Sequence, residues 1–341
     1  MEAVLNANQP VSIDLGDASQ VSAARIATQG LARALGFDEA DIGRVAIAIT
    51  EVATNVIRHG KGGWLFARAL SRGDSLGIEV LAVDDGPGMA NFAASSRDGH
   101  STGGTAGTGL GAMQRQADEF DVYTDSGRGT AMRMVFWDRE TGADTSGYEI
   151  GAVCVPKPGE DVSGDAWAAA FRGDGASFVV ADGLGHGPDA CIAAATAVEA
   201  FKNHAEQSAI RILDVIHGRL RPTRGAAVAV MRHEPATGEI VFAGVGNIAA
   251  CIWKGAGEPR RAMVSHNGIV GHNIHRSGEY RYPWPAGAFL VAHSDGLETQ
   301  WDLAEHPRLV ACHVSLVAAM LYREHSRKRD DVVVLVVRQR N

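Results

Sequence analysis

Acidic residues stand at the ends of several apolar strands in the second half of the chain. They are Asp165 in VSGDAW, Asp182 in VVADGLGHG, Asp295 in VAHSDGLET and the adjacent pair Asp330 and Asp331 in KRDDVVVLVV. Carboxylates that converge at one edge of a sheet suit Mg²⁺ or Mn²⁺. Two such ions that share a bridging water lower its pKa, and the resulting hydroxide attacks phosphorus in line. Each Asp alone is better explained by turn chemistry, but the ordered set favours a two-metal site.

A second set of polar residues lies in the first half. Glu51 and Asn55 are four residues apart in the helical pattern ITEVATNVIRHG, so they share one face and offer oxygens to a hydrated Mg²⁺. Asp84 ends an apolar strand in AVDDGPGM, where a carboxylate accepts a hydrogen bond from the exocyclic amine of adenine. The glycine-rich run GTGLG, residues 107–111, opens a helix whose first N–H groups face a phosphate. Because no strand ends directly before GTGLG, it is not a dinucleotide-binding fingerprint. Together these features predict an ATP site.

Two differently patterned halves position these residues. In the first half, apolar periodicity predicts helices over residues 19–35, 39–59 and 110–117, between strand-like segments such as VSIDL, GIEVLAVDD and TAMRMVFW. The second half is richer in strands and has helical patterns over residues 188–206, 209–220 and 309–325. A polar stretch, residues 138–147, reads as a linker. We therefore expect an α+β chain with domains over residues 1–137 and 148–341, each with helices layered on mainly antiparallel sheets.

Composition limits the classes of function. The 341 residues are 45% apolar, and 40 acidic residues outnumber 32 basic ones, giving a net charge of −8. With no Lys/Arg-rich tract, we expect no nucleic-acid partner. No apolar run is long enough to span a bilayer and the N-terminus has no signal-peptide pattern, so we expect no membrane association. The four widely spaced cysteines argue against a disulfide framework and favour the cytoplasm.

The ordered motifs of the first half resemble the N, G1 and G2 boxes of the GHKL superfamily, over roughly residues 10–137. Within it, TEVATNVIRHGKGG, DDGPGM and QADEFDVYTDSGRGT look most like the anti-sigma-type serine/threonine kinases, especially the RsbT branch. The resemblance implies a Bergerat-type α/β sandwich that binds ATP and Mg²⁺, with residues 90–108 as a nucleotide lid. It makes Glu51 the general base or an orienting group for the Mg²⁺ shell, and Asn55 the Mg²⁺ ligand. The remaining nucleotide contacts that it implies are Asp84, Gly86, Gly88, Gly107, Gly109, Leu110, Gly111 and Thr130.

The motifs of the second half resemble PPM-type serine/threonine phosphatases of the SpoIIE/RsbX branch, over roughly residues 148–338. SGDAW, ADGLGHGPDA, GVGN, SDGL and RDDVVV carry the likeness, which implies an αββα sandwich with two Mg²⁺ or Mn²⁺ ions. The family pattern makes Asp165 and Asp182 catalytic metal ligands, adds the Gly183 carbonyl and Asp295, and prefers Asp330 over Asp331. The chain departs from that pattern where Val332 and Val333 replace an expected Thr, so the choice between Asp330 and Asp331 stays open. No Arg precedes the first acid, which leaves phosphate binding mainly to the metals.

Three functions are compatible with these motifs. The first is a bifunctional regulator of a partner-switching pathway, whose kinase half phosphorylates a STAS-domain partner and whose phosphatase half removes the phosphate. That partner would be an anti-sigma-factor antagonist or a stressosome-type protein, and a sigma factor is a further candidate. The alternative makes the GHKL half a binding module that senses ATP, or holds a sigma factor or STAS protein, and regulates the phosphatase. A scaffold with two inactive sites is disfavoured, because Glu51, Asn55 and Asp84 are intact, as are the acids of the second half.

Overall fold

The computed structural model describes residues 4–6, 10–89, 109–139, 146–274 and 277–340. The described chain forms two compact units that do not follow its linear order. The smaller unit contains Pro10–Ala143 and Ala311–Arg323, and the larger unit contains Met1–Gln9, Asp144–Val310 and Glu324–Asn341. This division differs from the linear domains expected from the sequence, because a C-terminal segment is counted with the smaller unit.

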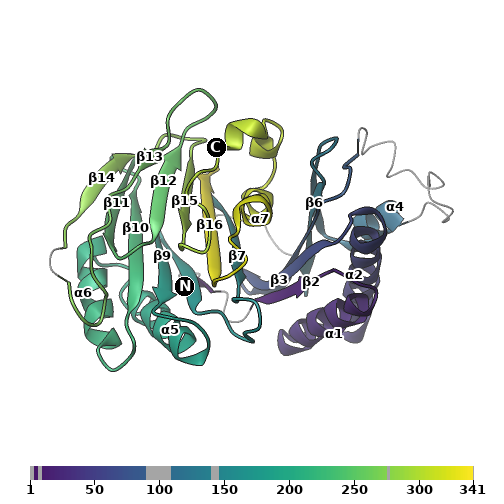
Figure 1. Cartoon of the computed structure of the whole chain (residues 1–341), viewed down its shortest axis with the longest axis horizontal. Coiled ribbons are helices and arrows are strands. Elements are labelled where there is room, and N and C mark those ends of the chain that lie inside the picture. Colours follow the sequence, from purple (N-terminus) through teal and green to yellow (C-terminus); the bar gives the residue numbers. More distant parts are fainter. Residues whose placement is uncertain (1–3, 7–9, 90–108, 140–145, 275–276, 341) are drawn as a thin grey trace. The chain divides into compact units, whose positions relative to one another are not determined.

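The smaller unit is a two-layer α/β sandwich. Its antiparallel sheet has the order β2-β3-β4-β6-β5 and is covered on one face by α1 and α2 (Figure 1). A short helix, α4, packs against α2 through Met113, which is fully buried in the same core. The elements are β2 (Val11–Asp14), α1 (Ser19–Ala34), α2 (Glu39–His59), β3 (Gly63–Arg72), β4 (Ser75–Asp84), α4 (Gly109–Gln116), β5 (Glu119–Thr124) and β6 (Thr130–Trp137).

Helix α2 shows why the sequence folds this way. Asp38 caps its N-terminus by accepting a 2.8 Å hydrogen bond from the Asp41 N–H, and Arg58 and His59 stand in the last turn, where the helix dipole favours positive charge. Apolar residues spaced three or four apart, including Val45, Ile49, Val52 and Val56, form a fully buried stripe against the sheet. The predicted range, residues 39–59, is confirmed at both ends.

The larger unit has two stacked antiparallel sheets. The six-stranded sheet has the order β1-β8-β9-β10-β11-β14, and the five-stranded sheet has the order β13-β12-β15-β16-β7. Helices α5 and α6 cover the outer face of the six-stranded sheet (Figure 1). The elements are β1 (Val4–Asn6), β7 (Tyr148–Val155), β8 (Asp165–Arg172), β9 (Gly175–Gly183), α5 (Pro188–Lys202), α6 (Ala209–Leu220), β10 (Ala226–Glu234), β11 (Glu239–Val245), β12 (Ala249–Trp253), β13 (Arg261–Ala262), β14 (Tyr280–Pro283), β15 (Phe289–His293), α7 (Val314–His325) and β16 (Val332–Gln339), of which α7 is counted largely with the smaller unit.

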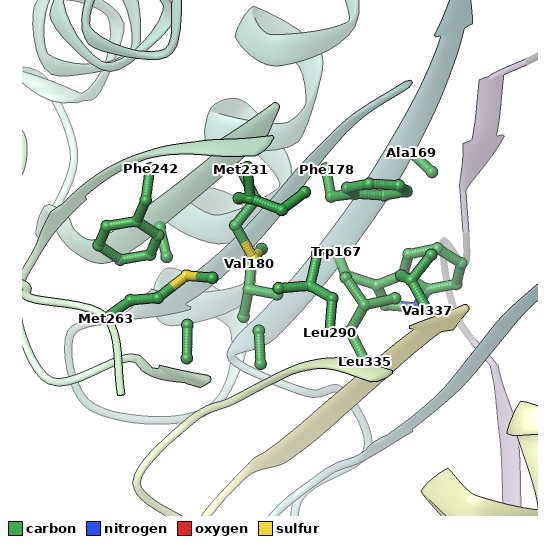
Figure 2. Close-up of a cluster of buried hydrophobic side chains, with 14 of the residues drawn as sticks. Trp167, Ala169, Phe178, Val180, Met231, Phe242, Met263, Leu290, Leu335 and Val337 are labelled. Atoms are coloured by element: carbon green, nitrogen blue, oxygen red, sulfur yellow. The ribbon is translucent and has the colours of Figure 1, made fainter. Parts of the chain in front are cut away.

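The core between the two sheets is built by inward-facing residues that alternate along the strands. Figure 2 shows Trp167, Phe178, Met231, Leu290 and Leu335 meeting in this layer. A second core, formed by alanine, valine and isoleucine, lies under α5 and α6. The α+β class and the antiparallel sheets expected from the sequence are confirmed. None of the helices in the described ranges is long and apolar enough to cross a membrane.

Candidate functional sites

Several predicted nucleotide-site residues of the smaller unit lie where α2 and β4 end and β6 begins. A Cβ added at Gly86 would lie 2.7 Å from the His59 carbonyl oxygen and 2.9 Å from Asp84 Oδ1, so only glycine allows this approach. The Asp85 N–H also donates to the Gly60 carbonyl at 3.1 Å. These contacts hold the end of α2 against the turn that follows Asp84. They place Glu51 and Asn55, both half-buried, on the helix that leads into the site.

Asp84 is the most constrained of these residues. Its side chain is buried, and Oδ1 accepts hydrogen bonds from the N–H groups of Gly86 at 2.8 Å and Thr130 at 3.1 Å. Burial raises the pKa of the Asp84 carboxyl, and the two N–H donors partly offset that effect. One carboxylate oxygen is thus fixed by the backbone, which orients the group as the predicted adenine acceptor.

Thr130 is joined to the same cluster by its backbone and its hydroxyl. The hydroxyl lies 3.1 Å from that of Thr124, which in turn accepts from the Met89 N–H at 2.7 Å. Gly88, with a φ of +65°, packs against the Asp125 carbonyl, where a side chain would collide. Thr130 therefore lies beside Asp84, and Gly88 packs against the turn that precedes Thr130.

The glycine-rich run is only partly described. Helix α4 begins at Gly109, Leu110 is half-buried and Gly111 is buried. Gly107 and the predicted lid, residues 90–108, lie outside the described residues. Their assignment as phosphate contacts stays a prediction.

In the larger unit, the acids lie at one end of the layer between the sheets. Asp165 starts β8 and pairs in register with Asp182 near the end of β9. Side chains alternate along each strand, so Asp165 lies on the same inward side as Trp167, and Asp182 on the same inward side as Val180. Asp295 follows β15, and Asp330 and Asp331 precede β16, the neighbouring strand. Acids from the ends of four strands thus lie at the same end of this layer.

Two of these acids carry buried oxygens with no hydrogen-bond partner among the described residues. Asp165 Oδ2 accepts from the Ser294 hydroxyl at 2.6 Å, while its Oδ1 is unpartnered. Asp331 Oδ1 accepts from the Lys157 N–H at 2.9 Å, while its Oδ2 is unpartnered. A buried carboxylate oxygen without a partner is costly, and a cation bound by Asp165 would satisfy its Oδ1.

The carboxylates also raise one another's pKa values. Burial, and then the Asp182 charge, raise the pKa of Asp165 well above its usual range. Burial, followed by Asp295, Asp330 and Asp331, raises the pKa of Asp182 to about 7. In the described part of the chain, no three His, Cys, Asp or Glu side chains stand close enough to ligate one ion. A bound divalent ion would therefore draw the carboxylates together against their mutual repulsion, and the donor set fits Mg²⁺ or Mn²⁺.

A cavity of 490 Å³ opens beside these acids. Asp182, Asp295 and Asp330 line it, whereas Asp331 is turned toward Asp165 and the Lys157 backbone. Gly183, between Asp182 and the pocket-lining Leu184, is buried under the first turn of α5, where a Cβ would collide with the Ala190 carbonyl. The cavity is large enough for a phosphorylated side chain next to the predicted metal ligands.

Several polar residues of this cavity were missed by sequence reasoning. Asn247, the last residue of the GVGN motif, donates from Nδ2 to Asp295 Oδ2 at 2.6 Å. Lys157 lines the cavity and adds a positively charged residue to it, although no Arg precedes the first acid in the sequence. His186 lines it too, and its Nδ1 lies 2.6 Å from Glu160 Oε1. His186 belongs to the ADGLGHGPDA motif, which indicates a place near the acids. Lys157 stands between two prolines, in a segment that matches no motif.

Comparison with known proteins assigns the two parts to families. Residues 16–136 match the model of the histidine kinase-like ATPase domain, and residues 172–340 match that of stage II sporulation protein E (SpoIIE). The chain is 35% identical to the serine/threonine-protein kinase RsbT of Bacillus subtilis over 120 residues, which are 35% of this chain and 90% of that protein.

Two solved structures resemble the chain over slightly more than half of its length. One, described under "The bacterial stressosome: a modular system that has been adapted to control secondary messenger signaling", is 30% identical with a TM-score of 0.52, covering 56% of this chain and 99% of that one. The other, RsbX in complex with magnesium, is 16% identical with a TM-score of 0.50, covering 57% and 96%, and shows a shared fold.

Proposed function

Because the chain belongs to the histidine kinase-like ATPase family in one part and to the SpoIIE family in the other, we propose that it is a bifunctional regulator of a partner-switching pathway. The smaller unit uses ATP to phosphorylate a Ser or Thr of a STAS-domain protein, and the larger unit removes that phosphate with divalent metal. The substrate is an anti-sigma-factor antagonist or a stressosome-type protein. Four free cysteines support a reducing, cytoplasmic setting.

The observation that carries the phosphatase assignment is the convergence of Asp165, Asp182, Asp295 and Asp330 beside one cavity, with a buried oxygen of Asp165 left unpartnered. These residues would hold two divalent ions, with the Gly183 carbonyl as a further ligand. Such ions would supply Lewis-acid chemistry, which lowers the pKa of water for attack on a phosphate ester.

The chain's own residues prepare that site. The Ser294 hydroxyl fixes one oxygen of Asp165, and the Asn247 amide fixes one oxygen of Asp295, so each carboxylate presents its other oxygen in a defined direction. Lys157 lines the same cavity, and its positive charge attracts the substrate phosphate. Between Asp330 and Asp331, the cavity position favours Asp330 as the ligand.

In the smaller unit, the orientation of Asp84 supports adenine binding. Its Oδ1 is held by two backbone N–H groups, and Gly86 and Thr130 pack around it. Asn55 binds the Mg²⁺ that accompanies the triphosphate, Gly109, Leu110 and Gly111 approach the phosphates, and Glu51 accepts the proton of the partner's hydroxyl.

One experiment separates the two activities. A purified STAS-domain partner is incubated with γ-labelled ATP and either the wild-type protein, Asp165→Asn, or Asn55→Ala. We expect the partner to accumulate label with Asp165→Asn, to reach a lower steady level with the wild type, and to stay unlabelled with Asn55→Ala. Asp214→Asn, an exposed Asp of α6 in an ion pair with Arg211, is the matched control and should behave like the wild type.

The possible outcomes identify the failing half. If Asp165→Asn binds ATP but labels no partner, the smaller unit is the sensing module of the alternative hypothesis. If the Mn²⁺-loaded wild type removes no phosphate from a labelled partner or a phosphoserine peptide, the phosphatase assignment is wrong.

A further inference from the structure

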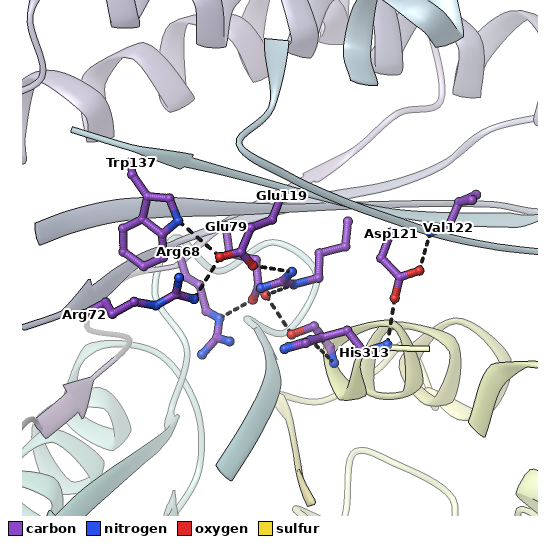
Figure 3. Close-up of polar contacts among 10 residues, drawn as sticks. Arg68, Arg72, Glu79, Glu119, Asp121, Val122, Trp137 and His313 are labelled. Atoms are coloured by element: carbon purple, nitrogen blue, oxygen red, sulfur yellow. Dashed lines mark hydrogen bonds and ion pairs between the residues drawn. The ribbon is translucent and has the colours of Figure 1, made fainter. Parts of the chain in front are cut away.

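A segment from the C-terminal part of the chain is built into the nucleotide-binding unit. Residues 311–323 are counted with the smaller unit by their contacts. The Ser315 hydroxyl donates to Glu79 Oε1 at 2.8 Å, and the His313 N–H donates to Asp121 Oδ2 at 2.7 Å (Figure 3). These contacts place α7 on the sheet face opposite α1 and α2.

The apolar side of this attachment is aromatic. The Tyr322 ring meets Trp64 and Phe66 edge-on, with centroids 5.5 Å and 5.3 Å apart. Helix α7 is buried at every residue from Val314 to Tyr322. These ring contacts and the Ser315 hydrogen bond hold the segment on the sheet of the smaller unit.

The last residue of the segment reaches the nucleotide site. Arg323 donates from Nη1 to the Asp84 carbonyl oxygen at 2.6 Å, and its Nε lies 3.7 Å from Asp85 Oδ1. Its side chain is 7% exposed. Gly129 has a φ of +77°, and a Cβ there would collide with both the Asp84 carbonyl and the Arg323 guanidinium. The chain thus leaves room for this guanidinium directly behind the predicted adenine acceptor.

The chain then enters the larger unit and leads to its metal site. The Glu298 N–H donates to the His325 carbonyl at 2.9 Å, and the Arg327 N–H donates to the Gly296 carbonyl at 2.9 Å. Both contacts lie next to Asp295. Three residues after Arg327 comes Asp330, which lines the metal cavity. The segment from Arg323 to Asp331 therefore runs from the nucleotide site to the acids of the larger unit.

We infer that Arg323 is a positioning residue for Asp84 and that residues 323–331 couple nucleotide binding to metal binding by Asp295 and Asp330. This inference rests on the proposed function, since it needs both sites to bind their ligands. No direct contact of Arg323 with nucleotide is required.

The coupling follows from what each ligand changes. The Arg323 charge favours the ionised Asp84 carboxylate, which is the form that accepts from the adenine amine. Adenine binding in turn favours the ionised Asp84, with the backbone position that the Arg323 hydrogen bond holds. Because binding linkage is reciprocal, a ligand that stabilises one end of the stretch alters affinity at the other by the same factor in both directions.

The first test measures adenine discrimination. Dissociation constants are determined for ADP and for IDP, which lacks the exocyclic amine, with the full-length protein, Arg323→Ala and Arg25→Ala. We expect Arg323→Ala to weaken ADP binding about ten-fold and IDP binding less than about two-fold. Arg25 is an exposed Arg of α1 outside the coupling stretch, so Arg25→Ala is the matched control and should bind both as the wild type does.

A conservative variant separates positioning from folding. Arg323→Lys keeps a positive donor and should recover part of the discrimination that Arg323→Ala loses. Equal weakening of ADP and IDP in Arg323→Ala, or no weakening of either, would overturn the positioning role.

The second test measures the coupling. Hydrolysis of p-nitrophenyl phosphate is followed against buffered free Mn²⁺, with and without saturating ADP. We expect ADP to shift the Mn²⁺ activation constant at least about five-fold in the wild type and in Arg25→Ala, and less than about two-fold in Arg323→Ala. An unshifted wild type, or a shift retained in Arg323→Ala, would refute the coupling. Failure of the proposed function looks different, because the wild type would then show no Mn²⁺-dependent hydrolysis or no ADP binding.

Discussion

Replacing Glu79 by glutamine removes one buried negative charge while keeping the shape of the side chain. Glu79 is 1% exposed, and each of its carboxylate oxygens lies 2.6 Å from the Nε of an arginine, Arg68 or Arg133. Burial alone raises the pKa of Glu79, but the two guanidinium groups lower it by more, so it stays well below its usual range. The glutamine would leave two buried cations facing one neutral amide. Breaking a buried pair in this way costs about 3–5 kcal/mol.

The expected shift is measurable in the smaller unit alone. A loss of 3–5 kcal/mol lowers the melting temperature of a unit of this size by roughly 10 °C or more. Unfolding is followed by calorimetry, and the transition that ADP raises is assigned to the smaller unit, because a ligand stabilises the state that binds it. The transition that Mn²⁺ raises is assigned to the larger unit and should not move.

Glu119→Gln is the matched control for this measurement. Glu119 belongs to the same network, with contacts to Arg72 at 2.8 Å and Arg133 at 3.0 Å, but its side chain is 30% exposed (Figure 3). Solvent screening limits its effect to about 1 kcal/mol. Equal losses for the two variants, or a neutral Glu79→Gln, would show that the buried charge does not stabilise the unit, and the reasoning would fail.

Three further predictions concern the larger unit. Asp165→Asn should stabilise the metal-free protein by on the order of 1 kcal/mol, because it removes a buried charge that the neighbouring carboxylates repel. The same substitution should lower phosphatase activity at least about 100-fold. A melting temperature in EDTA that is lower than that of the wild type would contradict the first expectation. Lys157→Met should raise KM for a phosphorylated partner about ten-fold and leave the Mn²⁺ activation constant unchanged, whereas a lower kcat at constant KM would exclude a phosphate-binding role. His233, whose Nδ1 lies 2.6 Å from the Tyr148 hydroxyl, has its pKa lowered by burial to about 4. Because the folded state holds the neutral imidazole, the free energy of unfolding is highest above pH 6.5 and falls by about 3 kcal/mol as the pH drops from 6.5 to 4. The free energy of unfolding of His233→Phe, measured by urea titration, should depend less on pH in that window.

Local signals predicted the elements that carry the motifs. Helix α2 was predicted at its true bounds because its cap, charged ends and apolar stripe all lie within the segment. The helix expected over residues 309–325 starts at Val314, since a 3₁₀ turn forms first at Leu309–Ala311 and the His313 N–H is used by Asp121. Strand β1 was not expected, because three residues give no pattern, and its pairing with β8 connects it to a distant part of the chain.

Long-range contacts were beyond sequence reasoning for a physical reason. Arg323 and Asp84 are 239 positions apart, and Ser294 and Asp165 are 129 apart. A motif states which side chains are present, but such partners depend on which faces pack together. Helix α7 shows the problem most clearly, since it is buried at every residue from Val314 to Tyr322 and no single apolar stripe indicates the sheet on which it lies.

Asp330 and Asp331, the adjacent acids before β16, occupy different environments, although the sequence motif does not decide which of them binds metal. Side chains alternate along an extended strand, so Asp331 shares the inward side of Val333 and Leu335, and Asp330 does not. Asp331 is accordingly buried, with one oxygen held by the Lys157 N–H, while Asp330 lines the cavity. An inner carboxylate whose second oxygen has no partner among the described residues is suited to support the site from behind. Asp331→Asn should therefore weaken Mn²⁺ binding less than Asp330→Asn, because the amide still accepts from Lys157 while Asp330 loses a charge that faces the metal.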